Sequence, residues 1–273
     1  MTSDLLTLAT SIAREAGELA ARRRREGVEV AATKSTVVDV VTEADREVER
    51  LIRNRLADAR PDDGILGEEE GGAQIGTSGL TWVVDPIDGT TNYLYGIPHY
   101  AISIAVVEGD PDPLTWVDVA GVVFNPASGE LFSAAVGAGA ALDGAPIHVA
   151  EPVDFGEALI GTGFAYASDM RGVQGAIVSR LLPHVRDIRR LGTASLDLSF
   201  VAAGRLNGYF ERTLSPWDHA AGAIIAREAG AIVKGLGDSA PSSDFIVAGE
   251  PGLAARLEAE LTALGVADPP LHR

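Results

Sequence analysis

The spacing of apolar residues predicts two amphipathic helices near the start of the chain. Apolar residues recur every three or four positions over residues 5–20, which is the period of a helix face buried against a core. The arginines at 22–25 and then Gly27 are typical of a helix C-terminus, where cations complement the helix dipole. A second helix, expected over residues 42–59, has a stripe formed by Ala44, Val48, Leu51, Ile52 and Leu56.

After residue 60 the pattern changes to short apolar runs separated by Gly, Pro and Asp, which predicts strands. Strands are expected at residues 80–84, 101–107, 117–124 and 129–136, and Asp143-Gly144 predicts a tight hairpin turn. From residue 158 strands and helices alternate. The strands are expected at 158–162, 187–191, 207–211, 231–234 and 245–248, and the helices at 172–182, 195–203, 216–229 and 252–264.

This mixture predicts an α/β fold in which helices cover the sheets. The pattern changes near residue 150, so we expect two halves within one compact unit. The first, residues 1–150, carries most of the acidic motifs described below, and the second, residues 151–273, completes the site.

Composition and charge exclude several classes of function and partner. The 273 residues are 46% hydrophobic, enough to exclude disorder as the main state, and the net charge of −17 makes nucleic acid and anionic membranes unexpected partners. The absence of cysteine excludes disulfides, thiolate metal sites and cysteine nucleophiles. No secretory signal and no apolar run of ~18 residues is present, so we expect a cytoplasmic protein. The four arginines are interpreted as a solvated helix end.

The most informative stretch follows the strand expected at 80–84. Asp85 and Asp88 stand three residues apart, Pro86 forces a turn between them, and Gly89 permits a tight one. The two carboxylates and the carbonyl of Ile87 can then face one point, and such oxygen ligands suit Mg²⁺. A helix could begin at the following Gly-Thr-Thr, where free backbone N–H groups would form an anion site. The alternative interpretation is an ordinary Asp-rich turn.

Two other acidic positions resemble this arrangement. Glu68 follows the apolar pair at 65–66 and Gly67, which would place it at a strand tip like Asp85. Asp218 lies three residues after Ser215, and the pair fits a capping box at the start of a helix. The same carboxylate could instead point into the site as a metal ligand, and the pattern alone leaves both roles open.

A fourth segment runs from Lys34 to Asp45. Thr42 and Asp45 fit another capping box, and Lys34 lies in a stretch without clear periodicity. Acidic loops without thiols favour Mg²⁺ over Zn²⁺, and bound cations would let this acidic chain accept a phosphate ester. The residues by themselves therefore indicate metal-dependent phosphoester hydrolysis.

These motifs resemble the inositol monophosphatase family. The matching segments are GEE at 67–69, DPIDGTTNY at 85–93, WDHAAG at 217–222, KSTVVDVVTEAD at 34–45 and GTA at 192–194. Their order and spacing agree over nearly the whole chain, and the bacterial inositol-1-monophosphatase branch is the nearest resemblance. The resemblance implies a layered α/β/α/β/α sandwich, a homodimer and inhibition by Li⁺.

The resemblance also implies a ligand set for two Mg²⁺ ions. The first would be held by Glu68, Asp85 and the carbonyl of Ile87, and the second by Asp85, Asp88 and Asp218. A third, outer site would make the metal content two or three ions per site. The ions would activate a water that hydrolyses inositol 1-phosphate, a small phosphate ester, to inositol and phosphate.

Further roles are implied for residues around the metals. Glu68 and Thr90, with Asp45 behind Thr90, would orient the attacking water. Backbone N–H groups of Gly89 and Thr90 would bind the phosphate. The residues implied to meet the inositol hydroxyls are Ala194, Glu211 and Asp218, and the residue implied to lie on a loop near the outer metal is Lys34.

Two alternatives stay open. The same chemistry could act on histidinol phosphate, a nucleotide 3′-phosphate or fructose bisphosphate, and Ser215-Pro216, where animal relatives carry other residues, puts the fine substrate preference in doubt. The second alternative is a non-catalytic interaction protein, favoured only by the net charge and the arginine cluster.

Overall fold

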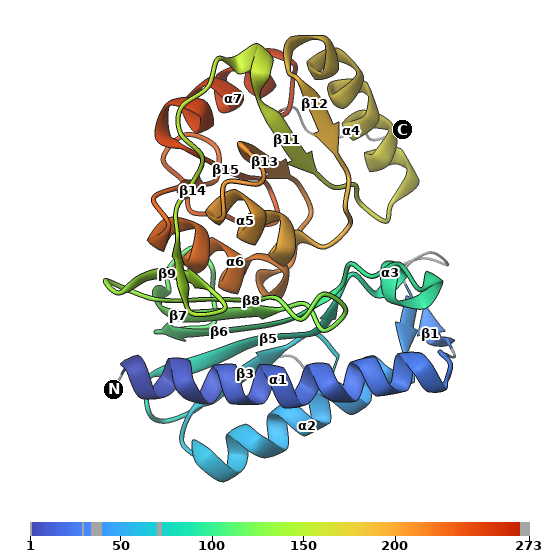
Figure 1. The fold of residues 1–273 in the computed structure, drawn as a ribbon, viewed down its shortest axis with the longest axis vertical. Coiled ribbons are helices and arrows are strands. Elements are labelled where there is room, and N and C mark those ends of the chain that lie inside the picture. The colour runs from blue at the N-terminus through green and yellow to red at the C-terminus, as the bar shows by residue number, and fades with distance from the viewer. Residues whose placement is uncertain (1, 29, 34–39, 70–72, 268–273) are drawn as a thin grey trace.

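Two long helices form the outer layer at one end of the molecule. The computed structural model describes residues 2–28, 30–33, 40–69 and 73–267. Helix α1 (Thr2–Glu26) and helix α2 (Glu43–Ala59) lie side by side against one face of a large sheet (Figure 1). Gly27, with a φ of 116°, follows α1, and Thr42 caps α2. Both helices confirm the predicted stripes.

The large sheet has eight strands and is antiparallel apart from one pair. β3 and β5 run parallel, so their carboxyl ends reach the same edge. The strands in spatial order are β10 (Ala145–Ile147), β9 (Gly139–Leu142), β8 (Leu131–Ala135), β7 (Val117–Phe124), β6 (Ala101–Glu108), β5 (Leu80–Asp88), β3 (Gly64–Gly67) and β4 (Ala73–Gln74). The predicted hairpin turn joins β9 to β10, and both its residues, Asp143 and Gly144, have positive φ.

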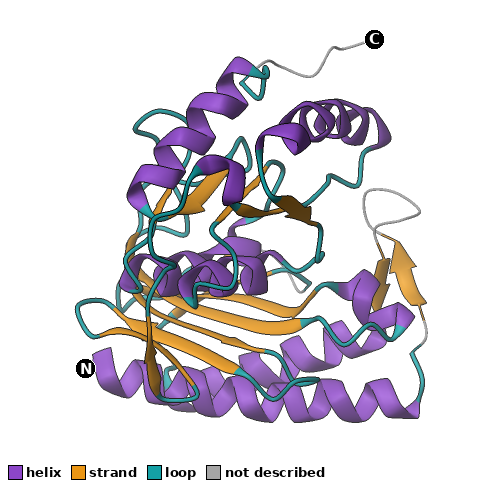
Figure 2. Cartoon of the chain, turned by 45° about the horizontal axis from the view of Figure 1, so that its top comes forward, coloured by secondary structure: helices purple, strands orange, loops and turns teal. Residues whose placement is uncertain are grey.

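Residues 148–158 lead to a second, five-stranded sheet. Its strands in spatial order are β12 (Asp187–Arg189), β11 (Leu159–Thr162), β13 (Gly208–Glu211), β15 (Ile246–Gly249) and β14 (Ile232–Lys234). Helices α5 (Ala194–Ala202) and α6 (Pro216–Glu228) lie between the two sheets, and α4 (Ser168–Leu181) and α7 (Pro251–Ala263) cover the outer face (Figures 1 and 2).

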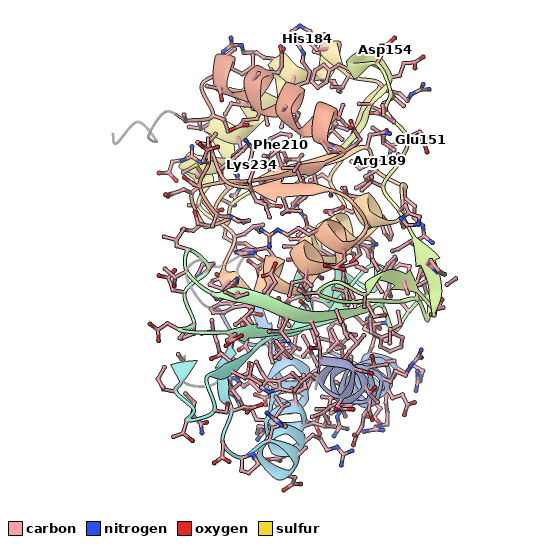
Figure 3. The ribbon with its side chains drawn as sticks, turned by 90° about the vertical axis from the view of Figure 1, so that its left-hand side faces the viewer. Glu151, Asp154, His184, Arg189, Phe210 and Lys234 are labelled. Atoms are coloured by element: carbon pink, nitrogen blue, oxygen red, sulfur yellow. The ribbon has the colours of Figure 1, made fainter. Side chains whose placement is uncertain are left out.

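Three apolar cores hold these layers together. The first joins α1 and α2 to the large sheet, the second surrounds α5 and α6, and the third joins the small sheet to α4 and α7. Alternate residues of β5 serve different cores, since Trp82 faces α2 and Val83 faces α6. The side view in Figure 3 shows the stack of layers. The fold is the α/β/α/β/α sandwich that was expected.

The structure differs from the sequence prediction mainly around the acidic motif. β5 does not end before Asp85 but continues to Asp88, with a break in register between these residues. The break accommodates Pro86, which has no N–H for the ladder. Helix α3 (Thr90–Tyr95) begins where the sequence indicated that a helix could start. The short strands β1 (Val30–Thr33), β2 (Val40–Thr42) and β4 were not predicted, because a strand of two to four residues is too short to show a period. Among the described residues, no helix is long and apolar enough to cross a membrane.

Candidate active site

A cavity of about 420 Å³ lies where the edge of the large sheet meets the small sheet and α6. Its wall brings together segments that are far apart in the sequence. All predicted metal-binding and substrate-binding residues line it, namely Glu68, Asp85, Ile87, Asp88, Gly89, Thr90, Ala194, Glu211 and Asp218. Asp45 lies behind this wall, in contact with Thr90. Lys34 lies outside the described residues.

The end of β5 holds Asp85 and Asp88 in fixed positions. The Asp85 carboxylate accepts a hydrogen bond from the N–H of Ile87 at 3.1 Å, and the Asp88 carboxylate accepts one from the N–H of Ser195 at 2.8 Å. The second bond ties the strand to the start of α5. Gly89 follows with a φ of 90°, and a side chain there would collide with the Thr193 hydroxyl. The turn therefore needs glycine for both its conformation and its packing.

Glu68 and Asp218 reach the cavity from two other elements. β3 ends at Gly67 beside β5, so Glu68 emerges at the same sheet edge as Asp85. Asp218 is the third residue of α6, where its carboxylate accepts a hydrogen bond from the N–H of Ser215 at 2.7 Å in a capping box. Asp218 therefore caps the helix and faces the cavity, so the two roles left open by the sequence are compatible.

The carboxylates in this wall raise one another's pKa values. Burial raises the pKa of Asp85 well above its ordinary value, and the charges of Glu68, Asp88 and Asp218 raise it further. Burial and the charges of Glu68 and Asp88 raise the pKa of Asp218 in the same way. Burial raises the pKa of Asp88 to about 7 although hydrogen bonds from Ser195 oppose the shift. It is therefore unfavourable for several of these carboxylates to be ionised at the same time.

A second polar chain runs from the cavity toward α2. The Thr90 hydroxyl lies 3.3 Å from a carboxylate oxygen of Asp45 and 3.1 Å from the carbonyl of Ile87. Asp45 is fully buried and completes a capping box with Thr42 at the start of α2. Burial raises the pKa of Asp45 to about 7, and hydrogen bonds from Thr42 oppose the shift. The same carboxylate thus caps a helix and orients the threonine.

Glu211 closes the far side of the cavity. It is the last residue of β13 and accepts a hydrogen bond from the Tyr209 hydroxyl at 2.5 Å. Burial raises its pKa to about 7, while the tyrosine and the Arg190 guanidinium oppose the shift. Ala194, the first residue of α5, lies on the same wall.

Comparison with known proteins decides the family. The family model described as the inositol monophosphatase family matches residues 1–265. The chain belongs to this family. It is 45% identical to the inositol-1-monophosphatase of Mycobacterium leprae, and the alignment covers 94% of this chain and 93% of that protein. It is therefore a phosphatase-family enzyme.

Solved structures of inositol monophosphatase relatives share the fold. Mycobacterium tuberculosis SuhB is 41% identical with a TM-score of 0.81, covering 98% of this chain and 99% of that one. The extragenic suppressor protein suhB of Bartonella henselae is 36% identical with a TM-score of 0.85, covering 94% and 98% of the two chains. Enzymes of this family are generally metal-dependent, so the fit of the cavity to a cation is the next question.

The donor set of the cavity suits a hard divalent cation. All its candidate ligands are oxygens, from Glu68, Asp85, Ile87, Asp88 and Asp218, and oxygen ligands favour Mg²⁺. Within the described ranges, no group of three Asp, Glu or His side chains forms a preformed metal-coordination site. Like charges repel, and a divalent cation between these oxygens would compensate that repulsion. The residues therefore fit a metal, with adjustment of their side chains.

Sequence reasoning did not single out Arg190, which lines the cavity, or Asn92, which bonds to the segment behind its wall. Arg190 lines the cavity and stacks over the Phe164 ring, 6.0 Å from its centroid. The net charge had indicated that an anionic substrate needs cations at the site, but no motif singled out this arginine. The side-chain amide of Asn92 donates to the carbonyls of His99 and Leu191, both at 2.8 Å. This amide joins α3 to the segment before α5.

Proposed function

We propose that this chain is a Mg²⁺-dependent phosphomonoesterase that hydrolyses inositol 1-phosphate to inositol and phosphate. One observation carries the proposal: Glu68, Asp85, Asp88 and Asp218 line a single cavity together with Thr90 and Glu211. Family membership supports the phosphatase chemistry, and the name of the M. leprae relative supports the substrate.

The acidic wall would hold the metals. Glu68, Asp85 and the Ile87 carbonyl would hold one Mg²⁺, and Asp85, Asp88 and Asp218 a second; an outer site near Lys34 would hold a third. Bound Mg²⁺ would lower the pKa of a coordinated water and stabilise the leaving oxygen. The mutual repulsion of these carboxylates supports this assignment, because a divalent cation would compensate it.

Thr90 and Asp45 would orient the attacking water together with Glu68. The Thr90 hydroxyl has one proton, which it can donate to Asp45, and its lone pairs are then free to accept from the water. Asp45 is fixed by its bonds to Thr42, so it would hold Thr90 in one rotamer. This arrangement supplies orientation, and Glu68 supplies a nearby carboxylate.

The substrate would lie between the two sheets. Backbone N–H groups of Gly89 and Thr90 would bind the phosphate, and Ala194, Glu211 and Asp218 would meet the inositol hydroxyls. A carboxylate such as Glu211 accepts hydrogen bonds from vicinal hydroxyls, which supports a polyol over an aromatic leaving group. The homodimer expected from the family resemblance stays a prediction.

A phosphate-release panel tests the proposal. The substrates are inositol 1-phosphate, histidinol phosphate, a nucleotide 3′-phosphate and fructose 1,6-bisphosphate, each with Mg²⁺, with EDTA, and with Mg²⁺ plus Li⁺. We expect the highest kcat/KM on inositol 1-phosphate, no release in EDTA and inhibition by Li⁺. A higher kcat/KM on another member of the panel would overturn the substrate, and turnover in EDTA would overturn the metal dependence.

A further inference from the structure

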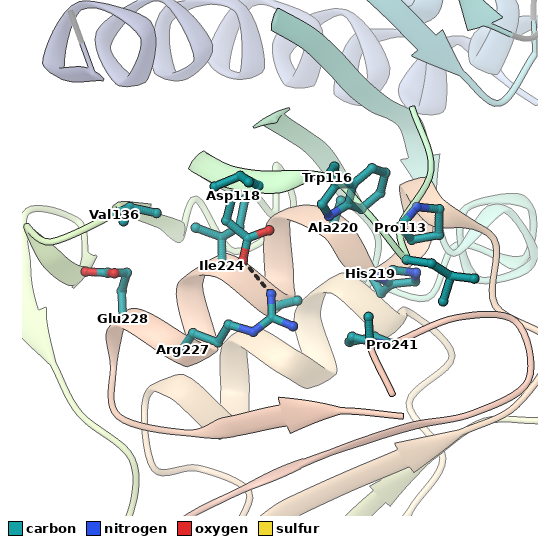
Figure 4. Close-up of a pocket in the computed structure, with 14 residues that line it drawn as sticks. Pro113, Trp116, Asp118, Val136, His219, Ala220, Ile224, Arg227, Glu228 and Pro241 are labelled. Carbon is teal, nitrogen blue, oxygen red and sulfur yellow. Dashed lines mark hydrogen bonds and ion pairs between the residues drawn. The ribbon is translucent and has the colours of Figure 1, made fainter. Parts of the chain in front are cut away.

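A second cavity, of about 440 Å³, lies between the start of β7 and one face of α6 (Figure 4). We call it the Trp116 cavity, and it is lined by residues 113, 114, 116–118, 136, 219, 220, 223, 224, 227, 228, 240 and 241. It shares no lining residue with the candidate active site. It does contact α6 directly after Asp218, so both cavities border the same helix.

An unpartnered histidine lies at one end of the Trp116 cavity. His219 is 2% exposed, and neither ring nitrogen has a hydrogen-bond partner among the described residues. Its ring lies 6.3 Å from the Trp116 ring, centroid to centroid (Figure 4). A buried polar group without a partner is unfavourable, so a ligand that supplies a donor or an acceptor gains affinity there.

The charged groups of the cavity are already satisfied within the protein. Asp118 and Arg227 form an ion pair with each other, and Arg227 also donates to the carbonyl of Val233 at 3.0 Å (Figure 4). The Glu228 carboxylate accepts from the N–H groups of Gly137 and Gly139. A charged ligand would lose hydration, and the one charge that has no opposite charge among the described lining residues, Glu228, already accepts two backbone hydrogen bonds. The wall therefore favours a neutral ligand.

The remaining lining is apolar and suits a ring. Ala223 and Ile224 form a buried floor on α6, and Pro113 and Pro241 lie on either side of His219 in Figure 4. At the cavity, the side chains of Leu114, Val117 and Val136 are 58%, 61% and 52% exposed. Exposed apolar residues around a hollow are typical of a binding site, because a ligand covers them.

We propose that the Trp116 cavity is a second small-molecule site, for a compact neutral ring compound that carries an amide or hydroxyl group. The ring packs between Trp116 and the floor of α6, and the polar group bonds to His219. The carboxylates and Arg190 of the candidate active site take no part in this binding.

Ligand-observed NMR titration of the full chain tests the site. The probes are benzamide and indole-3-acetamide, with benzoate and benzylamine as charged controls, all in the presence of inorganic phosphate and Mg²⁺. We expect saturable binding of the neutral amides and at least several-fold weaker binding of the charged compounds. Absence of saturable amide binding to the wild-type chain up to the solubility limit would overturn the proposal.

Two variants locate the binding. His219→Leu removes the polar group and should weaken amide binding about tenfold. Ala240→Trp fills the cavity from a loop and should abolish binding, while Ala57→Trp, on the exposed face of α2, is the matched control and should bind like the wild type. Thermal unfolding of each variant shows that it is folded. Wild-type affinity in both His219→Leu and Ala240→Trp would place the amides elsewhere and overturn the assignment.

Discussion

Two buried carboxylates at opposite ends of the same strand pair have opposite surroundings. Asp63, 5% exposed, precedes β3 and accepts hydrogen bonds from Arg60 at 2.8 and 3.0 Å and from the Trp82 indole at 2.8 Å. Asp85, 2% exposed, lies near the end of β5 beside other carboxylates. Burial raises the pKa of Asp63, but its donors outweigh burial and the net pKa is lowered, whereas the pKa of Asp85 is raised.

The difference in surroundings distinguishes a carboxylate that stabilises the fold from carboxylates suited to a functional site. A buried acid that has donors and a cation is compensated within the protein, so its charged form stabilises the fold. Acids whose charged neighbours are all other acids lack an opposite charge until a cation binds, and their ionised forms weaken the fold in its absence. Uncompensated groups of this kind cluster at functional sites. The comparison therefore predicts that substitutions at the two ends have opposite effects on stability and activity.

The largest effect is expected from Asp85→Asn. Loss of a charge that is proposed to bind metal should lower kcat on inositol 1-phosphate by roughly 10²–10³-fold or more. The same change removes repulsion from the wall, so thermal unfolding in EDTA should occur at the wild-type temperature or a few degrees above it. Addition of Mg²⁺ should stabilise the wild type and have little effect on the variant. Wild-type turnover in Asp85→Asn would contradict the metal role.

Asp63→Ala should give the converse result. It removes the partner of Arg60 and of the Trp82 indole, so the free energy of unfolding should fall by about 2–4 kcal/mol. Because Asp63 is not among the residues lining the cavity of the candidate active site, kcat of the folded protein should be unchanged. Urea unfolding and phosphate release measure the two quantities. Asp62→Ala, at the exposed neighbouring position, is the control, and an equal loss there would remove the distinction.

The pH dependence of stability should also have opposite signs. The folded pKa of Glu211 is about 7, against roughly 4.3 in an unfolded chain, so the folded state binds the proton more tightly. Its contribution is fully present below pH ~4 and is lost as the pH rises through 7. Asp63, with a lowered pKa, contributes stability above its unfolded value of roughly 3.9, and this is lost as the pH falls through the folded pKa.

Unfolding in EDTA across pH 4–8 separates the two groups. Glu211→Gln should abolish about 1–2 kcal/mol of the loss of stability between pH 5 and 8. Asp63→Asn should keep that loss and remove part of the decline in acid. An unchanged slope between pH 5 and 8 in Glu211→Gln would contradict the raised pKa.

The sequence predicts the role of Asp85, near the end of β5, better than the role of Asp63, before β3. The stripes of α1 and α2 and the apolar runs of the strands have enough periods to predict the layers, and the acidic motifs predict which carboxylates line one cavity. Asp63, by contrast, looks like part of a Pro-Asp-Asp-Gly turn, and nothing local shows that its carboxylate bonds to Trp82, nineteen residues later. Its role depends on tertiary packing.

The same limit applies inside the candidate site. Gly89 was predicted to permit a tight turn. The extent of α3 was not predicted, because its six residues are too few to show a helical period. β5 was expected to end before Asp85, because the break in register that passes Pro86 depends on pairing with β6. Arg190 follows β12, and the parallel pairing of β12 with β11 places this residue at the cavity. The local sequence does not show which strands pair.

The smallest expected effect concerns the helix caps. Asp45 and Asp218 both complete capping boxes, with Thr42 and Ser215, yet only Asp218 is proposed to bind metal. Ser215→Ala removes the hydroxyl of the N-cap residue, which serine favours at this position, so the free energy of unfolding should fall by about 1 kcal/mol. The backbone N–H of Ser215 still holds the Asp218 carboxylate at 2.7 Å, so kcat should change less than tenfold. Phosphate release measured beside urea unfolding checks both. A hundredfold loss of kcat would show that the serine hydroxyl, rather than the backbone, orients Asp218.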